Sequence, residues 1–391
     1  MHELDPLAAV ISADPYPYYE RLVAERPFSR DDTLGMWVAA SAEAVEVVLS
    51  STVMHVRPPS EPMPNAIAET PMAEIFSRWA RMTDGRRQST VKNAVVATLG
   101  RLDWNELTAT SERCAKLLAR TLSAGGRGDV EAFLLGLPAL ATATTLGLAQ
   151  DDASRAVAWT SDFVRSIAPG STRDEIARGT SATAALSTAL LAEPHPDGSL
   201  FAVFLDEGRR HRIEDGVIAA NAIGFLFQSY DATAGLIGNT LVALARREDL
   251  RDAVRGDADL LERVIAEVAR FDAPVQNTRR FAAADTTVMG SHVGAGEAVL
   301  VVLAAANRDP SVNPYPHRFD PARDERRTYT FGIGAHACPG ARMATTIAGA
   351  GVSHLLEAGV DFQQFAAPAY RPSLNARVPT FESRVPLGAV S

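Results

Sequence analysis

Cysteine and lysine are both scarce in this 391-residue chain, and each scarcity is informative. Two cysteines are too few for a disulfide framework, so we expect a cytoplasmic protein. Only two of the 38 basic residues are lysines, Lys92 and Lys116, a bias typical of a GC-rich bacterial genome. The formal net charge of −9 lacks the basic footprint of a nucleic-acid-binding protein, so no nucleic-acid partner is expected.

The chain also lacks any segment typical of membrane insertion or export. Its first residues, MHELDPLAAVISADPYPYYERL, have neither a basic stretch nor a long apolar run, so neither signal peptide nor membrane anchor is expected. The 47% hydrophobic and 22% charged residues are ordinary for a globular protein. No repeat or low-complexity tract is present, and we expect one domain over 1–391 that is monomeric.

Helical periodicity dominates the sequence. Residues 103–126 and 130–150 read as helices, the second apolar nearly all round and therefore buried on several sides. Strands are short, with a hairpin over 286–310 that turns at Gly294–Gly296. The proline-rich segment 307–325 reads as an ordered, meandering loop. The fold class is therefore mainly α with small β-sheets.

One helix is expected to be exceptionally long, over residues 214–248. Its length exceeds that of most globular helices. Four polar residues stand at its centre, Gln228, Ser229, Tyr230 and Asp231, so it is not a membrane span. A long buried helix with a polar waist is a candidate functional site.

A single cysteine lies in a glycine-rich loop that leads into a helix of small residues. The loop reads FGIGAHACPG and includes Phe331, Gly332, His336, Cys338 and Gly340. Glycines permit positive φ and a close backbone approach to a flat cofactor. The positive end of the following helix favours a thiolate. These features suit a thiolate metal ligand, whereas the simpler interpretation is a buried structural cysteine.

A zinc site is poorly supported, because structural zinc needs three or four Cys or His ligands and only Cys114 supplies another thiol. Cys114 itself reads as a core residue of a helix. The whole ten-residue pattern resembles the haem-binding loop of the cytochrome P450 family. That resemblance extends over nearly the whole chain. It implies a long central helix over haem b (iron-protoporphyrin IX), with the cysteine loop and its helix beneath and Cys338 as axial ligand.

The resemblance assigns a structural role to a Glu-x-x-Arg pair, Glu267 and Arg270. The i, i+3 spacing places both on one helix face. In the family such a pair binds an arginine of the following meander, for which Arg318 is the expected residue here. The pair would hold the loop that presents Cys338.

Haem propionates need cationic partners, and the resemblance points to Arg280 and His336. It also matches a helix in which the family has a His-x-x-x-Arg pair. Gln88 and Lys92 hold those two places here. Lysine donates as a point charge without the fork of arginine, and glutamine is neutral, so anchoring would depend more on Arg280 and Lys92.

The polar waist departs from the family pattern. The family has a small-residue pair, an acid and a threonine on the helix over the haem. The stretch DATAGLIGN resembles the family's sequence after that pair and fixes how the two sequences align. Asp231 keeps the acid, Ala232 replaces the threonine, and Gln228 and Ser229 replace the small residues. Thr233 lies one residue on, about 100° around the helix, so it does not simply substitute. The family's acid–alcohol pair orders water for proton delivery.

Three ways of delivering protons without the threonine hydroxyl stay open. A fourth alternative is that the substitution has no functional effect and the enzyme hydroxylates in the ordinary way. A substrate hydroxyl, amine or amide could hold the catalytic water, which is the remedy we favour. Ser229 or Gln228 could donate instead, since both lie near the face of Ala232. Peroxide-driven oxidation, or an outcome other than hydroxylation, is the third.

Substrate contacts are expected from four segments of the chain, 54–82, 153–205, 275–282 and 370–382. The first mixes apolar walls with one potential anion partner, and its candidates are Met54, Arg57, Met63, Ile67, Phe76 and Trp79. A modest polar metabolite, amino-acid-derived or of polyketide type, fits this mixture.

Electrons must come from a separate ferredoxin or flavodoxin with its reductase, because no flavin or NAD fingerprint occurs. A basic patch for that partner is expected from Arg86, Arg87, Lys92, Arg326, Arg327 and Arg342.

The favoured function is a haem-thiolate monooxygenase that hydroxylates a metabolite in bacterial secondary metabolism. An alternative is the same haem performing C–C or C–O coupling, ring formation, desaturation or peroxide-driven oxidation. A haem sensor or carrier without turnover is the remaining reading, and Asp231 in its relay position disfavours it.

Overall fold

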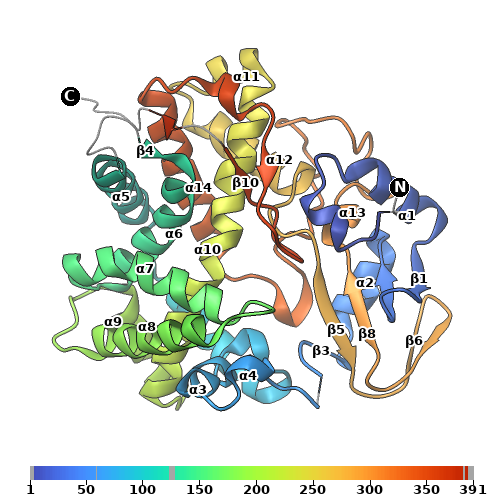
Figure 1. The fold of residues 1–391 in the computed structure, drawn as a ribbon, viewed down its shortest axis with the longest axis horizontal. Helices are drawn as coiled ribbons and strands as arrows, with labels where there is room; N and C mark the ends of the chain where they lie inside the picture. The colour runs from blue at the N-terminus through green and yellow to red at the C-terminus, as the bar shows by residue number, and fades with distance from the viewer. Residues whose placement is uncertain (1–3, 59, 123–127, 382–383, 386–391) are drawn as a thin grey trace. The chain divides into compact units, whose positions relative to one another are not determined.

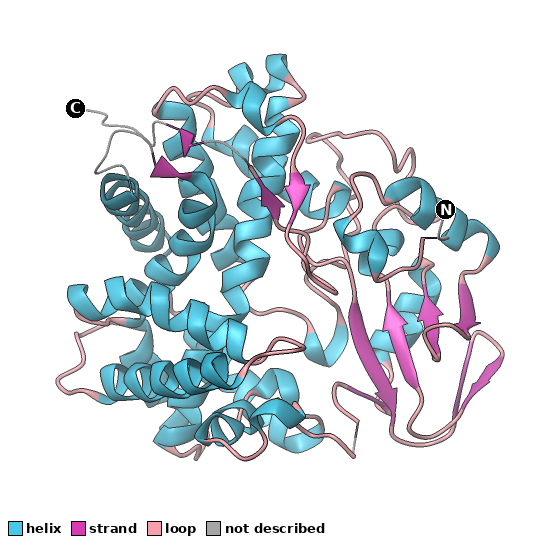
Figure 2. Cartoon of the chain, viewed as in Figure 1, coloured by secondary structure: helices cyan, strands magenta, loops and turns pink. Residues whose placement is uncertain are grey.

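The computed structural model describes residues 4–58, 60–122, 128–381 and 384–385. It is mainly helical with small sheets, which confirms the expected fold class (Figures 1 and 2). The α-helices are α1 (Tyr16–Glu25), α2 (Ala42–Ser50), α3 (Pro71–Ser77), α4 (Gly85–Gly100), α5 (Trp104–Leu122), α6 (Val130–Leu146), α7 (Gln150–Ser166), α8 (Arg173–Leu191), α9 (Leu200–Arg210), α10 (Asp215–Ala245), α11 (Glu248–Ala253), α12 (Ala258–Phe271), α13 (Leu303–Ala306) and α14 (Ala341–Glu357). Across these described ranges, none of the helices is both long and apolar enough to cross a bilayer.

The strands are few and short. They are β1 (Phe28–Asp31), β2 (Met36–Ala39), β3 (Met54–His55), β4 (Gly128–Asp129), β5 (Thr278–Ala282), β6 (Thr286–Val288), β7 (Ser291–Val293), β8 (Ala298–Val301), β9 (Ala369–Tyr370), β10 (Pro379–Thr380) and β11 (Arg384–Val385). Short 3-10 segments are η1 (Ala8–Ile11), η2 (Asn65–Ile67), η3 (Ala80–Met82), η4 (Gly334–His336) and η5 (Phe362–Phe365).

Two compact units make up the chain, and each is described by itself. The first comprises residues 1–55, 115–134 and 231–391, and the second comprises 56–114 and 135–230. Helices α5, α6 and α10 contribute to both. The expectation of one domain over 1–391 stays a prediction.

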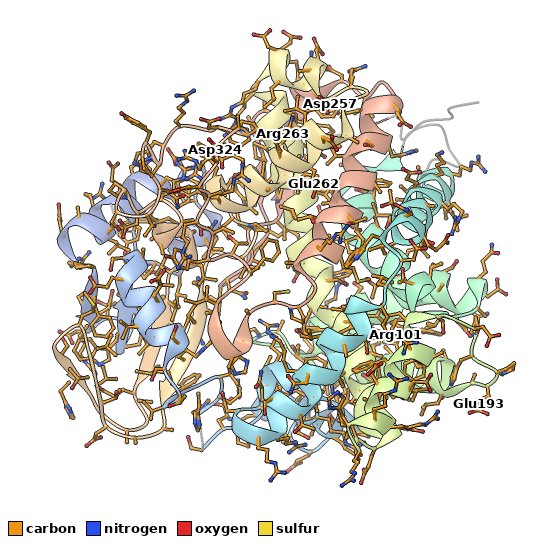
Figure 3. All side chains as sticks on the ribbon, turned by 180° about the vertical axis from the view of Figure 1, so that it is seen from behind. Arg101, Glu193, Asp257, Glu262, Arg263 and Asp324 are labelled. Atoms are coloured by element: carbon orange, nitrogen blue, oxygen red, sulfur yellow. The ribbon has the colours of Figure 1, made fainter. Side chains whose placement is uncertain are left out.

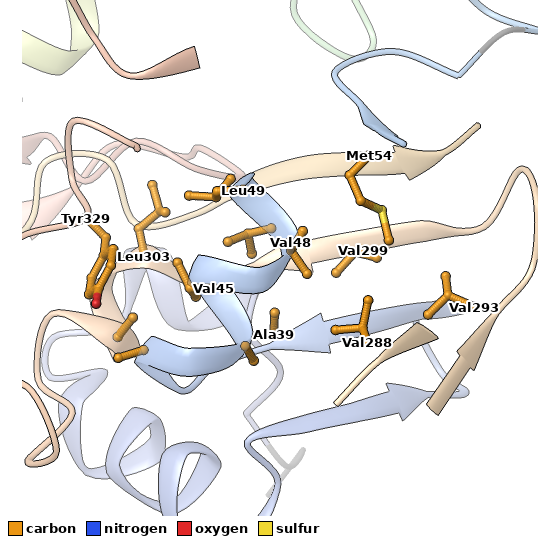
Figure 4. Close-up of a cluster of buried hydrophobic side chains, with 14 of the residues drawn as sticks. Ala39, Val45, Val48, Leu49, Met54, Val288, Val293, Val299, Leu303 and Tyr329 are labelled. Carbon is orange, nitrogen blue, oxygen red and sulfur yellow. The ribbon is translucent and has the colours of Figure 1, made fainter. Parts of the chain in front are cut away.

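A mixed five-stranded sheet organises the first unit, in the order β1-β2-β8-β5-β3. Only the β2–β8 pairing is parallel. Helix α2 packs on this sheet through Val45, Val48 and Leu49, which face Met54 and Val299 in a buried apolar cluster (Figure 4). Tyr329, the residue that leads into the cysteine loop, joins the same cluster, so the loop begins on a rigid base.

The hairpin expected over 286–310 forms, but its turn was placed wrongly. β6 pairs with β7 around Met289 and Gly290, which have φ of 50° and 79°. Two successive positive φ values are typical of the two-residue turns that match strand twist. Methionine rarely adopts a positive φ, so the sequence around Met289 gave no signal of a turn. Gly294–Gly296 instead belongs to the connection between β7 and β8.

The long central helix forms as predicted: α10 spans 31 residues. Its second half, in the first unit, lies very close to the chain near the C-terminus. A Cβ atom added at Gly235 would lie 2.8 Å from the Arg377 carbonyl oxygen, and one at Gly238 would lie 2.4 Å from Pro379. Asn239 donates from Nδ2 to the Asp272 carbonyl (2.8 Å). The two glycines thus permit a backbone approach that alanine would block.

The first half of α10 carries an aromatic contact within the second unit. Trp79 is fully buried, donates from Nε1 to the Ala220 carbonyl (2.7 Å) and stacks on Phe227 with ring centroids 4.9 Å apart. Phe163 meets both rings edge-on. Burial of such rings is among the largest apolar contributions a side chain makes.

Candidate functional site

The cysteine loop is closed by its own backbone hydrogen bonds. Cys338 N donates to the Phe331 carbonyl (2.7 Å), and Gly332 N donates to the Tyr329 carbonyl (2.7 Å). Cys338 is exposed, two residues before the N-cap Gly340 of α14. Cys114, by contrast, is 4% exposed within α5, as expected for a core residue. Cys338 is therefore accessible on its loop, whereas Cys114 is packed in the core.

The glycines of this loop are required by its shape. Gly332 and Gly334 have φ of 64° and 66°, in the left-handed region that favours glycine. A Cβ at Gly334 would also lie 2.9 Å from the Leu49 carbonyl oxygen at the end of α2. Any side chain at Gly334 would push the loop off α2, so this glycine fixes where Cys338 is presented.

Glu267 and Arg270 form the expected pair, and both side chains are completely buried. Arg270 donates to the two carboxylate oxygens of Glu267 at 3.0 and 2.6 Å. Its remaining hydrogen bonds go to the carbonyls of Asn307 (3.2 Å), Pro316 (2.9 Å) and Arg318 (3.2 Å). Arg270 thereby binds the meandering loop at three separate points.

The arginine expected to complete this pair was assigned wrongly. The Arg318 side chain is 72% exposed, and its Nε lies 3.7 Å from Asp320. Arg326 donates from Nε to Glu267 (3.0 Å), and Arg323 Nε lies 3.7 Å from the same carboxylate. Asp320 N adds a fourth donor at 3.0 Å. The meander has no periodicity, so residue spacing could not show which of its arginines points inward.

The sequence did not identify the residues that hold the start of the cysteine loop. Asn307 accepts at Oδ1 from Tyr329 N (2.6 Å) and donates from Nδ2 to Thr330 Oγ1 (2.8 Å). Tyr329 donates from its hydroxyl to Glu46 on α2 (2.6 Å). Burial, and then this bond to Glu46, raise the pKa of Tyr329 to about 12. A polar residue directly after α13 was the available signal for Asn307.

Helix α12 separates these buried contacts from solvent. Glu262 and Arg263 lie on its exposed face (Figure 3), whereas Glu267 and Arg270 point inward. The buried positions of α12 pack against α14, where a Cβ at Gly349 would sit 3.7 Å from Ile265 Cδ1. The helix after Cys338 is therefore attached to the helix that carries the ion pair.

The donor set around Cys338 fits a haem iron and does not fit a multi-ligand metal ion. Among the described residues, no group of three or more His, Cys, Asp or Glu side chains could hold a metal. A haem iron would need only one thiolate from the protein, because the porphyrin supplies nitrogen ligands of its own. An exposed cysteine on a glycine-bounded loop, just before a helix N-terminus, meets that need.

The expected propionate partners are placed on separate elements of the two units. Arg280 lies on β5, is 7% exposed, and donates from Nη1 to the Arg279 carbonyl (2.8 Å). His336 lies in η4, half-buried, two residues before Cys338. In the second unit, Gln88 (4% exposed) and the half-buried Lys92 lie one turn apart on α4. Their role toward a propionate stays a prediction.

Gln228 and Ser229, which stand where the family has small residues, each donate a hydrogen bond within their own helix. Ser229 donates from Oγ to the Leu226 carbonyl (3.1 Å) and lies 3.4 Å from Thr142 Oγ1. Gln228 donates from Nε2 to the Gly224 carbonyl (2.9 Å). Both side chains thus satisfy backbone carbonyls of their own helix.

The acid of the waist is bound by an arginine distant in sequence. Arg371 Nη1 donates to Asp231 Oδ1 at 3.1 Å. Burial raises the pKa of Asp231 above its ordinary value, and Arg371 partly opposes that rise. Ala232 follows, half-buried, and Thr233 is 1% exposed with no hydrogen-bond partner for Oγ1 among the described residues. Sequence reasoning found Asp231 but gave no signal for Arg371.

The expected basic patch is smaller than proposed. Arg326 is turned inward to Glu267 with 17% of its side chain exposed. Arg327 stays 57% exposed but pairs with Glu46 (2.8 Å). Arg342 is exposed at the start of α14. Arg86 and Arg87 are exposed on α4 of the second unit.

The segment expected to line the substrate pocket is partly core. Met54 joins the cluster under the sheet, and Phe76 and Trp79 are 2% and 0% exposed. Arg57, the potential anion partner, donates to Glu61 instead (3.2 Å to its carboxylate). Side chains at these positions therefore support local structure in the two units.

Comparisons with known proteins show which proteins this chain resembles. The model of the family described as "Cytochrome P450" matches residues 188–358. Cytochrome P450 monooxygenase PikC of Streptomyces venezuelae is 28% identical over 376 residues, covering 94% of this chain and 89% of PikC. Epothilone B-bound cytochrome P450epoK has a similar fold, with a TM-score of 0.84 at 22% identity, covering 99% of this chain and 100% of that one.

A further solved structure shares this fold. P450BioI in complex with hexadec-9Z-enoic acid ligated acyl carrier protein matches with a TM-score of 0.76 at 20% identity, covering 93% and 96% of the two chains. Solved structures at this identity show the shared fold alone.

Proposed function

We propose that this chain is a cytochrome P450, a haem-dependent oxidoreductase, and that it oxidises a polar metabolite using haem b held by Cys338. The bound haem would supply the activation of dioxygen. The observation that carries the proposal is that Cys338 is exposed on a closed loop before α14. A structural cysteine would be packed as Cys114 is.

The Glu267–Arg270 network supports the fixed presentation of Cys338. Arg270 binds the carbonyls of the meander, and Asn307 binds the backbone of Tyr329 at the loop's start. A ligand held within about half an ångström of its working position needs such support from surrounding residues. We assign the propionates to Arg280, His336 and Lys92, with Gln88 as a neutral donor.

Proton delivery is proposed to depend on the substrate. Ala232 has no hydroxyl, the Ser229 hydroxyl donates to the Leu226 carbonyl, and one N–H of the Gln228 amide donates to the Gly224 carbonyl. A substrate hydroxyl, amine or amide would therefore hold the water that Asp231 supplies with protons. Thr233 carries a hydroxyl next to Ala232 in sequence, but it lies about 100° around the helix from Ala232.

Two substitutions test this route. With a metabolite that shifts the haem from low to high spin, coupling is measured as product formed per reducing equivalent consumed. Substrate assistance predicts unchanged or lower coupling in Ala232→Thr and unchanged coupling in Thr233→Val, which keeps the shape of Thr233 without its hydroxyl. A clear gain in the first variant, or a collapse in the second, contradicts it.

The metabolite screen should cover free and carrier-bound compounds. The similar solved structures hold epothilone B in one case and a fatty acid on acyl carrier protein in another. Product analysis would separate hydroxylation, which we propose, from coupling or ring formation.

A separate ferredoxin or flavodoxin with its reductase is proposed as the electron source. Within the first unit, Arg327 and Arg342 are the exposed arginines of the expected patch, and Arg327 is paired with Glu46. Location in the cytoplasm and the monomeric state stay predictions.

A further inference from the structure

Arg371 binds two carboxylates that come from different helices. Its Nη1 lies 3.1 Å from Asp231 Oδ1 on α10, and its Nε lies 3.5 Å from Glu131 Oε1 on α6. All three side chains belong to the first unit and are about one-third exposed, at 29%, 37% and 35% for Arg371, Asp231 and Glu131. One cation is thus shared between two anions.

The backbone fixes where this arginine stands. Arg371 directly follows β9, and its N–H donates to the Val378 carbonyl (3.0 Å) beside the β9–β10 pairing. Segment 377–379 is in turn pressed onto α10 at Gly235 and Gly238. Gly235 lies four residues, about one helical turn, after Asp231. The close packing of these glycines therefore brings Arg371 to Asp231.

We propose that Arg371 is a positioning residue that sets the protonation of Asp231, and that Glu131 competes with Asp231 for its guanidinium. The inference rests on the proposed function, in which Asp231 supplies protons. The inference adds how a half-buried Asp231 can both release and regain a proton.

The charges at this point act in opposite directions. Arg371 favours ionised Asp231, whereas the negative charge of Glu131 and the burial of Asp231 disfavour it. Asp129, two residues before Glu131, is engaged by accepting from Ala132 N (3.2 Å). Tyr370, beside Arg371, lies under the Arg377 guanidinium. Arg371 is therefore the cation that acts on Asp231. The strength of its attraction to Asp231 depends on how far Glu131 attracts the same guanidinium.

A carboxyl group whose protonated and ionised forms have similar free energies is suited to proton transfer. A strongly bound carboxylate would hold no proton at neutral pH, and an isolated buried acid would not release one. Because one arginine is shared between two acids, Asp231 has an intermediate affinity for a proton. Protonation of Asp231 would free Arg371 to bind Glu131 alone, so the neutral form is also accommodated.

The test uses the haem-loaded protein in its reduced, carbonyl-bound form, which is diamagnetic. The pKa of Asp231 is followed by NMR of carbon-13-labelled aspartate side chains, with Asp231→Asn identifying the signal. Arg371→Gln should raise this pKa by roughly one pH unit, because a neighbouring opposite charge is lost. Glu131→Gln should lower it, because a competing negative charge is lost.

The opposite signs distinguish electrostatic control from structural damage. Arg371→Lys should restore part of the shift, since it keeps the charge without the fork. Arg251→Gln is the matched control: its partner Glu248 lies on α11 in the same unit, away from Asp231. Shifts of the same sign in Arg371→Gln and Glu131→Gln, or no shift in either, overturn the proposal.

The readout separates this inference from the proposed function. If the NMR shifts appear as stated, Arg371 controls Asp231 whatever the reaction. The pH dependence of coupling is then measured in the same variants. A coupling profile that follows the NMR values supports Asp231 as the proton source, and one that ignores them contradicts the proposed function alone.

Discussion

Replacing Glu267 by glutamine tests whether the buried ion pair holds the cysteine loop. The carboxylate accepts four hydrogen bonds, two from Arg270 (2.6 and 3.0 Å), one from Asp320 N (3.0 Å) and one from Arg326 (3.0 Å). Glutamine keeps the shape but leaves the Arg270 charge, which is fully buried, without its counter-charge.

Breaking a buried pair in this way costs about 3–5 kcal/mol, because an uncompensated charge stays in the interior. A folded domain is stable by only about 5–15 kcal/mol, so the loss is a large fraction of the total. The expected free energy of unfolding for Glu267→Gln is lower than that of the native protein by this amount at pH 7. Glu262→Gln, on the exposed face of the same helix, should stay within about 0.5 kcal/mol of the native protein.

The effect should also depend on pH in a defined direction. Burial acts to raise the pKa of Glu267, but the bonds from Arg270, Asp320 N and Arg326 outweigh it, so the pKa lies below its ordinary value of 4.5. A group with a depressed folded-state pKa contributes its full stability above the unfolded value and loses it as the pH falls through the folded value. The difference in free energy of unfolding between the native protein and Glu267→Gln should therefore become smaller below about pH 4.5.

Urea unfolding followed by circular dichroism measures these differences, with Glu262→Gln run beside Glu267→Gln at pH 7 and in acid. A loss below about 1 kcal/mol at pH 7 would show that the pair is not what stabilises the meander. A gap that stays constant into acid would show that the carboxylate charge is not the cause. The carbonyl difference spectrum of the reduced protein then reports whether Cys338 is still presented correctly.

Two further substitutions have matched controls. Cys338→Ala should abolish the carbonyl difference band of a thiolate-bound haem, whereas Cys114→Ala, which empties a small core site, should keep the band and lose about 1–2 kcal/mol in urea unfolding; equal spectra would contradict the ligand assignment. Gly235→Ala places a methyl group 2.8 Å from the Arg377 carbonyl oxygen and should cost about 1–3 kcal/mol. Gly349→Ala meets only an ordinary contact at 3.7 Å in mid-helix and should stabilise by up to about 1 kcal/mol, so equal effects of the two would refute the close approach.

Local spacing along the chain is enough to predict a large part of the site. The family resemblance singled out Glu267 and Arg270, and their i, i+3 spacing places both on one helix face. The glycines around Cys338 suit the left-handed backbone that Gly332 and Gly334 adopt. The length of α10 follows from uninterrupted apolar periodicity. These features depend on residues within a few positions of one another, which the sequence displays directly.

Contacts between distant segments were decided by the tertiary structure. Arg326, not Arg318, reaches Glu267, because the path of the meander turns one side chain inward and the other outward. Arg371 reaches Asp231 across 140 residues, because close packing of the C-terminal segment on α10 brings it there.

The sequence by itself determined a mainly helical protein with a thiol presented on a glycine-bounded loop and an alanine where a proton-relay alcohol is expected. Side-chain type at fixed short spacing encodes such features, since helix geometry and permitted φ values are local properties. Only the tertiary structure decided which cations serve Glu267 and Asp231. A long-range ion pair depends on how the intervening chain packs, and aperiodic segments carry no local signal of that path.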